Sequence, residues 1–329
     1  MPGHARPGHA RSTPTYTMSA RHLSLLILLA SLWGASFLFI RVGVAEFGVA
    51  PLMALRVGFG ALFLVGLALW RVGAAPLAAA LRSHAWPLLV CGLLNSAAPF
   101  CLFAFAELTL QAGITSVINA TAPLWSAVVA YVWLRERLSL TRTLGLVTGF
   151  AGVLLLVARQ VFAPDSGTGS TTGSAGATAL AATAALAATL LYGIAANYTK
   201  RKLSGVDPLL NAAGTMIGST VLLLLPALAT WPATPVSAHA WGSVLALGVL
   251  CTGVAYFIFF HLIAHVGPSR AITVTFVIPI FGIFWGAVFL DEAVAPVMLA
   301  GCAVVLLGTA LATGVIRRIP GLGPARDAA

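Results

Sequence analysis

The stretch VWLRERLSL, residues 132–140, closes a long apolar run, and its frame recurs as VFLDEAVAP at residues 288–296. A valine, a leucine and a glutamate recur at a constant offset of 156 residues, as Val132/Val288, Leu134/Leu290 and Glu136/Glu292. The arginines that flank the first glutamate are absent from the second copy. The pattern indicates one duplicated segment whose two copies lie in different surroundings.

The repeat extends beyond this segment. The same offset pairs prolines and glycines, as Pro123/Pro279, Gly145/Gly301 and Gly152/Gly308. Near the start of each half, WGASFLFIR (33–41) resembles YGIAANYTK (192–200) at an offset of 159. These matches predict that the chain consists of two similar halves.

Composition identifies the class of protein. Of the 329 residues, 60% are hydrophobic and 8% are charged, whereas soluble domains carry about 25% charged residues. The apolar residues form blocks of about 20, which is the length that a helix needs to cross a bilayer. β-Barrel strands alternate apolar and polar residues, and these blocks do not. The sequence therefore predicts an all-α integral membrane protein.

The apolar blocks, bounded by charged residues, proline and glycine, predict ten transmembrane helices. Their expected ranges are 22–40, 51–70, 85–106, 112–134, 140–158, 178–199, 208–230, 240–262, 268–290 and 294–315. The domains follow as a disordered tail (1–21, with Met18 a candidate true start), a first repeat (22–158), a Gly/Ser/Thr-rich linker (159–177), a second repeat (178–315) and a tail (316–329).

Basic residues predict the orientation. If the amino terminus is cytoplasmic, fifteen of the eighteen Lys and Arg residues fall in cytoplasmic segments, as the positive-inside rule requires. We therefore expect a multi-pass protein of the cell membrane with both termini inside. Because each half has five helices, the second half enters the bilayer inverted, which explains why its copy of the segment has lost the arginines.

An inverted repeat is typical of secondary transporters, whose two halves enclose a central site. Polar groups inside such helices are expected to face a cavity or a neighbouring helix. Aligning the halves nominates one set of residues for the wall of a substrate cavity, and close helix packing is the alternative interpretation. This set is Trp33, Phe37, Arg56, Asn95, Phe100, Asn119, Pro123, Tyr192, Asn197, Tyr256, Thr275 and Pro279.

Arg56 breaks the symmetry, because its counterpart in the second half is Ala213. It lies about five residues inside its helix, where a cation costs roughly 2.5–3.5 kcal/mol at the centre of the bilayer. One interpretation is that it reaches back to the outer interface. The other is that it binds a solute carboxylate or closes a gate.

Small residues and cysteines complete the pattern. Gly145, Gly149 and Gly152 on the fifth helix, with Gly301 and Gly308 on the tenth, predict a close helix–helix contact, expected within one chain. The four cysteines lie in apolar blocks without a CxxC or Cys/His cluster, so no metal, cofactor or catalytic residue is expected. All eight acidic residues fall in loops or at helix ends, which leaves no mid-membrane carboxylate to relay protons.

Several segments resemble the EamA-domain branch of the drug/metabolite transporter superfamily. They are WGASFLFIRVG, PLMALRVGFGAL, TAPLWSAVVAYVWLRERLSLTRTLGLVTGFAGVLLL and IPIFGIFWGAVFLDEAVAPVMLAGCAVVLLGTAL. The resemblance covers residues 22–315 and includes the Pro–x(12)–Glu–x(8)–Gly frame of each half. It implies ten helices in two repeats and export of small metabolites such as amino acids. The superfamily's small multidrug exporters carry a glutamate in their first helix; this chain has none, so their proton-antiport mechanism is not implied.

We therefore expect a secondary transporter that exports small metabolites by alternating access. The alternative is a membrane-embedded enzyme acting on lipid-linked substrates, which would want paired acids, a metal set or long catalytic loops. The loops here are mostly short, which favours transport and no enzyme activity. The expected partners are a small-molecule substrate and the lipid bilayer, with no nucleic acid, and we expect a monomer before a homodimer.

Overall fold

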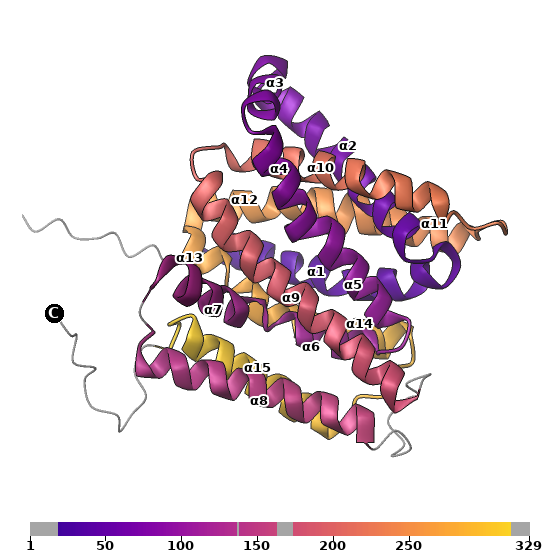
Figure 1. Ribbon diagram of the computed structural model, residues 1–329, viewed down its shortest axis with the longest axis vertical. Coiled ribbons are helices and arrows are strands. Elements are labelled where there is room, and N and C mark those ends of the chain that lie inside the picture. The colour runs from indigo at the N-terminus through magenta and orange to yellow at the C-terminus, as the bar shows by residue number, and fades with distance from the viewer. Residues whose placement is uncertain (1–18, 137, 163–173, 317–329) are drawn as a thin grey trace, which may run out of the picture.

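The structure, a computed structural model, describes residues 19–136, 138–162 and 174–316, and that part of the chain is helical without strands (Figure 1). Most of each expected tail and most of the expected linker lie outside the described residues, but Ala20 and Arg21, expected in the disordered tail, begin α1. The helices are α1 (Ala20–Phe47), α2 (Val49–Arg71), α3 (Ala74–Ser83), α4 (Ala85–Gly92), η1 (Leu93–Ala97), α5 (Ala98–Glu107), α6 (Ala112–Asn119), α7 (Ala122–Leu134), α8 (Leu140–Phe162), α9 (Ala175–Lys202), α10 (Pro208–Ala229), α11 (Ala238–Leu245), η2 (Ala246–Val254), α12 (Ala255–Val266), α13 (Pro268–Ala271), α14 (Val274–Phe289) and α15 (Pro296–Ala312).

Within the described ranges, nine helical stretches are long and apolar enough to cross a membrane. They correspond to the first nine predicted spans. The tenth, Pro296–Ala312, has 17 residues, so its length at 1.5 Å per residue is about 25 Å, less than the roughly 30 Å of a hydrocarbon core. The prediction of an all-α multi-pass membrane protein is confirmed, although the tenth span is shorter than expected.

Helix α3 was not expected. It is a ten-residue helix between the second and third spans, and its Leu77 is buried against the core that α1, α2 and α10 share. The segment AAPLAAALRS is too short to register as a span, but alanine and leucine are strong helix formers. Leu77, together with the partly buried Ala80 and Leu81, packs this short helix against the bundle.

The internal repeat is visible in the helix packing. A Cβ placed on Gly34 of α1 would lie 2.6 Å from Phe281 Cβ and 2.9 Å from the Gly282 nitrogen of α14. A Cβ on Gly193 of α9 would meet the same positions of α7, 2.7 Å from the Trp125 carbonyl carbon and 2.8 Å from the Ser126 nitrogen. These contacts are related by the offsets of 159 and 156 seen in the sequence. The first helix of each half therefore packs through a glycine against the fourth helix of the other half.

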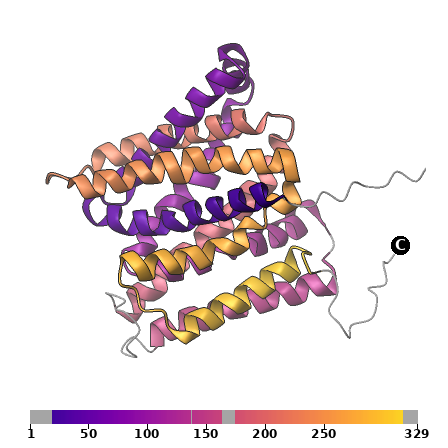
Figure 2. The same ribbon diagram turned by 180° about the vertical axis from the view of Figure 1, so that it is seen from behind.

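Helices α8 and α15 form a separate pair at one edge of the bundle, side by side in both views (Figures 1 and 2). Gly145 contacts Ala312 and Gly308, and Gly152 contacts Val305. Residue numbers rise along one helix as they fall along the other, so the pair is antiparallel, as inversion of the second half requires. The predicted glycine contact thus lies within one chain. Its further members are Gly149, which abuts Gly308, and Gly301, which lies 3.4 Å from Leu156 as measured from a Cβ placed on the glycine.

The third and eighth spans share an irregularity. Span Ala85–Glu107 contains the π-helical segment η1, and span Ala238–Val266 contains η2. The five residues of η1 correspond to residues 249–253 of η2 at the offset of 156. π-Helical turns widen a helix locally and occur frequently at functional sites, and both segments face the interior of the bundle.

The two ends of the bundle differ in charge. We call "the basic end" the end that carries Arg71, Arg135, Arg142, Lys200 and Arg270, and "the opposite end" the end that carries Glu46, Glu107, Asp291 and Glu292. The long helices run across the view of Figure 1 between these ends. That the basic end is cytoplasmic stays a prediction from the positive-inside rule.

Candidate functional site

A cavity of about 900 Å³ lies between the two halves. Its volume is within the range of about 300–1,000 Å³ that small-molecule sites occupy. Helices from both halves contribute to its wall. The residues that line it include Trp33, Phe37, Ile40, Arg56, Asn95, Phe100, Phe103, Asn119, Pro123, Ser126, Ala130, Glu136, Arg142, Tyr192, Ala196, Asn197, Lys200, Cys251, Thr252, Tyr256, Phe259, Pro268, Ile272, Thr275, Ile278 and Thr313.

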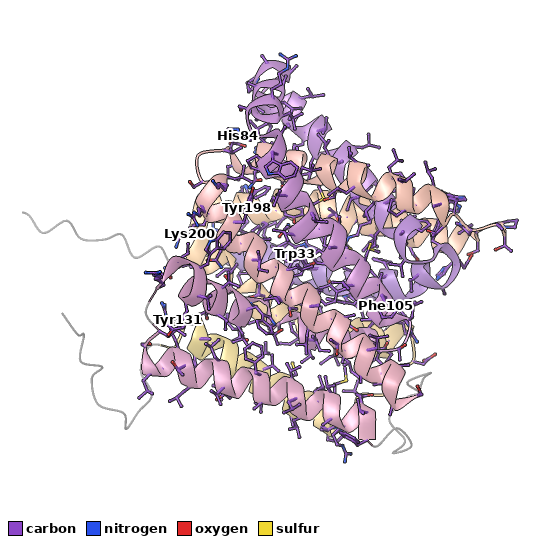
Figure 3. All side chains as sticks on the ribbon, viewed as in Figure 1. Trp33, His84, Phe105, Tyr131, Tyr198 and Lys200 are labelled. Atoms are coloured by element: carbon purple, nitrogen blue, oxygen red, sulfur yellow. The ribbon has the colours of Figure 1, made fainter. Side chains whose placement is uncertain are left out.

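The cavity opens at the basic end. There its lining includes the exposed side chains of Glu136, Lys200 and Pro268. Toward the opposite end the lining side chains Ile40 and Phe103 are buried. Figure 3 shows Lys200 at the left edge of the bundle and Trp33 near its middle, which gives the direction from mouth to interior. The conformation is therefore open at the basic end and closed at the opposite end.

The structure brings together eleven of the twelve residues predicted for the cavity wall, and the exception is Pro279. Pro279 is buried inside α14, which continues past it without a break. The wall at this point is formed by Thr275 and Ile278 instead. At the next turn α14 packs closely against other helices, because a Cβ on Gly282 would meet Ser116 of α6 and the Gly282 nitrogen faces Gly34 of α1. A role of the other eleven in solute binding stays a prediction.

Arg56 lies at the closed end of the cavity and is 7% exposed. Its Nε donates a hydrogen bond of 3.3 Å to Thr252 Oγ1, and its Cζ lies 3.7 Å from the ring centroid of Phe100. The position on the cavity wall disagrees with the interpretation that Arg56 reaches back to the membrane interface. Among the residues that the structure describes, the ion pair found is that of Lys200 with Glu136, so Arg56 has no carboxylate partner there.

The other polar groups of the cavity wall differ in how many hydrogen bonds they already make within the protein. Asn95 Nδ2 and the Tyr256 hydroxyl are 3.5 Å apart, so this pair is at the limit of a hydrogen bond. Asn197 Nδ2 donates to the carbonyls of Ser126, at 3.0 Å, and Gly193, at 2.9 Å. Asn197 therefore holds α9 against α7, whereas Asn95 and Tyr256 are more available to a solute.

Two wall residues near Arg56, Thr252 and Cys251, are among those that the sequence analysis did not select. Thr252 hydrogen-bonds Arg56 and donates to the Leu247 carbonyl across the π-helical segment at 3.0 Å, and Cys251 lies beside it. At the offset of 156 they correspond to Ser96 and Asn95. Extending the repeat alignment through the eighth span would have nominated Cys251 through Asn95, whereas Ser96, the counterpart of Thr252, was not selected.

Acidic residues lie at the closed opposite end, where the sequence analysis predicted no site. Glu292, in the loop between α14 and α15, accepts hydrogen bonds from the backbone N–H groups of Ala112 at 2.7 Å and Gly113 at 3.0 Å. Burial raises the pKa of the Glu292 carboxyl, opposed by the N–H groups of Gly113 and Ala112 and by the Arg41 guanidinium. This carboxylate thus ties the second half to the start of α6 in the first half.

Glu107 and Arg41 lie in the same region. Glu107 is fully buried, and among the described residues neither of its carboxyl oxygens has a hydrogen-bond partner, whereas its backbone carbonyl accepts a hydrogen bond from Arg41 Nη1. A buried ionised carboxyl group without a hydrogen-bond partner is costly. Together with Glu292 these groups form a layer of ionisable side chains at the opposite end, outside the lining of the cavity.

Comparison with known proteins gives a consistent result. Residues 21–158 and 179–314 each match the model of the "EamA-like transporter family". The chain is 23% identical to the "Uncharacterized transporter YoaV" of Bacillus subtilis, over 89% of this chain and 97% of that protein. It is 28% identical to the "Probable terminal-alkyne amino-acid exporter" of Streptantibioticus cattleyicolor, over 87% of this chain and 91% of that protein.

A solved structure shares the fold. A chain titled "Crystal structure of protein" aligns with a TM-score of 0.64 at 19% identity, covering 92% of this chain and all of that chain. At this identity the likeness supports the architecture of the helices and no more.

Proposed function

Because the chain belongs to the EamA-like transporter family, we propose that it exports small metabolites, with amino acids or related carboxylates as the solute class, by alternating access. The observation that carries the proposal is Arg56, a buried guanidinium at the closed end of the cavity without a carboxylate partner among the described residues. A planar guanidinium binds a carboxylate through two parallel hydrogen bonds, and a solute can supply that carboxylate.

The remaining wall suits the other parts of such a solute. Trp33, Tyr256 and Phe259 form an aromatic cluster, with Trp33 centroid distances of 6.3 Å to Tyr256 and 5.2 Å to Phe259. Aromatic faces attract an ammonium group and pack against apolar side chains. Asn95 and Tyr256 add a hydrogen-bonding pair. A zwitterionic amphipathic molecule would find a partner for each of its groups.

The charges at the mouth of the cavity also favour a solute that carries a carboxylate. Lys200 and Arg142 line the cavity at the basic end, where Glu136 already neutralises part of the charge of Lys200. Basic side chains at a cleft raise the local concentration of anionic groups and speed their entry. With the basic end cytoplasmic, as its charge predicts, the cavity would load from the cytoplasm and release on the other side, which is the direction of export.

Transport by purified protein tests the proposal. Proteoliposomes are loaded with a panel of radiolabelled amino acids and matched amino-acid amides, and efflux is compared with that from protein-free vesicles. We expect efflux of at least one apolar or aromatic amino acid and at least about tenfold slower efflux of its amide, because a charge-assisted contact contributes roughly 1.5–3 kcal/mol. Equal rates for acid and amide across the panel would contradict the proposed solute class.

A further inference from the structure

One backbone turn, present twice, delivers a glutamate to each end of the bundle. Among the residues that the structure describes, Arg135 and Asp291 are the two non-glycine residues with positive φ, at 55° and 52°. They are related by the offset of 156, and a glutamate follows each. The Glu136 N–H donates to the Ala130 carbonyl at 3.3 Å, and the Glu292 N–H donates to the Gly286 carbonyl, its counterpart, at 3.2 Å. The two carboxylates therefore leave equivalent helix ends in equivalent ways.

Their contacts nevertheless differ. Glu292 accepts hydrogen bonds from the backbone N–H groups of Ala112 and Gly113 and lies against Gly286. Glu136 Oε1 instead accepts a hydrogen bond of 2.9 Å from Lys200 Nζ, and the Glu136 side chain is 44% exposed at the cavity mouth. The end that Glu292 occupies is closed, and the end that Glu136 occupies is open.

From this contrast we infer that Glu292 and Glu136 are the two gate residues of the transport cycle. Glu292 holds the opposite end closed in the conformation seen here. When the basic end closes, Glu136 leaves Lys200 and docks on the segment that begins at Pro268, the counterpart of Ala112, while Glu292 is released. The inference rests on the alternating access of the proposed function and assigns it to two named side chains.

The positions at which the two glutamates dock differ in their backbone donors and in the room they leave for a carboxylate. This difference biases the equilibrium between the conformation open at the basic end and the conformation open at the opposite end. The counterpart of Ala112 is Pro268, which has no N–H to donate, so one of the two backbone donors is missing at the basic end. The counterparts of Gly113 and Gly286 are Ser269 and Ala130. A Cβ on Gly286 would collide with Glu292 Oε2, so Ala130 leaves less room for a carboxylate. The contact at the basic end is therefore the weaker one, and the resting protein stands open at that end.

Spin-label distances in detergent, without solute, test the inference. One label pair replaces the exposed Leu108 and Val294 at the opposite end, and another replaces the exposed Tyr131 and Ile272 at the basic end, in a background without the native cysteines. We expect Glu292→Gln to raise the ratio of opposite-end-open to opposite-end-closed protein at least about tenfold, because the amide loses the charge that both N–H groups bind. Pro268→Ala should move the ratio in the same direction by restoring a donor at the basic end.

The second glutamate provides the decisive comparison. Adding Glu136→Gln to Glu292→Gln should reverse most of the shift, because it weakens the contact that the first substitution allows to form. Asp291→Asn is the matched control. It changes the charge of the neighbouring exposed residue, keeps a side chain that tolerates positive φ, and should leave the distances unchanged.

Two results would overturn the inference. One is an unchanged distribution in both Glu292→Gln and Pro268→Ala; the other is an equal shift in Asp291→Asn. If Glu292→Gln does not fold, Pro268→Ala still tests the gate assignment, because Pro268 is exposed and its substitution should not disturb the fold. The distances are measured without solute, so they do not depend on the proposed solute class. If the protein exports no amino acid, the proposed solute is contradicted and the gate assignment is not. If the protein transports but the distances do not change, only the gate assignment is contradicted.

Discussion

Arg56→Gln is expected to slow efflux of a carboxylate solute about 10- to 100-fold, from the loss of roughly 1.5–3 kcal/mol of charge-assisted hydrogen bonding. The guanidinium already has Thr252 and the face of Phe100 as neighbours, and these leave donors free for a ligand. Glutamine keeps a polar side chain of moderate length but has no charge and cannot present two parallel donors to a carboxylate. The measurement is initial efflux from proteoliposomes as a function of solute concentration.

The matching control is a change of solute. The amide of the same amino acid lacks the carboxylate, so its slow efflux should be affected less than threefold by Arg56→Gln. Arg56→Lys should give an intermediate rate, because lysine keeps the charge without the planar pair of donors. If acid and amide lose the same factor in Arg56→Gln, the residue stabilises the fold and does not bind the solute carboxylate.

Gly34→Leu and Gly193→Leu are each expected to abolish most of the folded protein. In both cases the added side chain would meet the backbone of the facing helix, at Gly282 and Ser126 respectively. Backbone cannot move aside as a flexible side chain does, so the cost should be at the upper end of, or above, the roughly 1–3 kcal/mol measured for overpacked cores. The measurement is the monodisperse fraction after extraction and the midpoint of thermal unfolding.

Gly66→Leu is the control for this pair. Gly66 also lies inside a spanning helix, but a Cβ there would meet no atom of the described part of the chain within 4 Å. It should behave as the unsubstituted protein does. A large loss of folded protein for Gly34→Leu with no loss for Gly193→Leu would show that the first helices of the two halves pack differently. That result would contradict the structural equivalence of the two repeats.

Most of the architecture could be predicted because a bilayer imposes simple rules. Spans of about 20 apolar residues are easily recognised in a sequence. The pairs Pro123/Pro279 and Glu136/Glu292 share one offset, which reveals the duplication. The exceptions are local. Helix α3 depends on burial of Leu77, a tertiary contact that no window of hydropathy records. The tenth span is shorter than predicted because α15 begins and ends inside the predicted range. The ends of helices and strands are the features that a sequence predicts least reliably.

The candidate site could be predicted in part for the same reason. Polar residues in apolar spans stand out, which is how Arg56 and Asn95 were nominated. Glu292 was passed over because a carboxylate in a loop is ordinary, and only the structure shows that it reaches back to Ala112 and Gly113, about 180 residues earlier in the chain. Pro279 was nominated although it does not line the cavity, because the sequence does not show which helices pack against each face of α14.

Alternating access requires that one cavity opens first to the basic end and then to the opposite end. Ala196→Cys, at a small exposed position of the cavity wall, reports on both in a background without the native cysteines. The introduced thiol is exposed to a membrane-impermeant maleimide in whole cells and in inside-out vesicles, in the otherwise unsubstituted protein and together with Glu292→Gln. Alternating access of this cavity predicts fast modification in inside-out vesicles and slow modification in whole cells, with at least about a tenfold gain in whole cells when Glu292→Gln is added. Modification from the same single side in both proteins would contradict it.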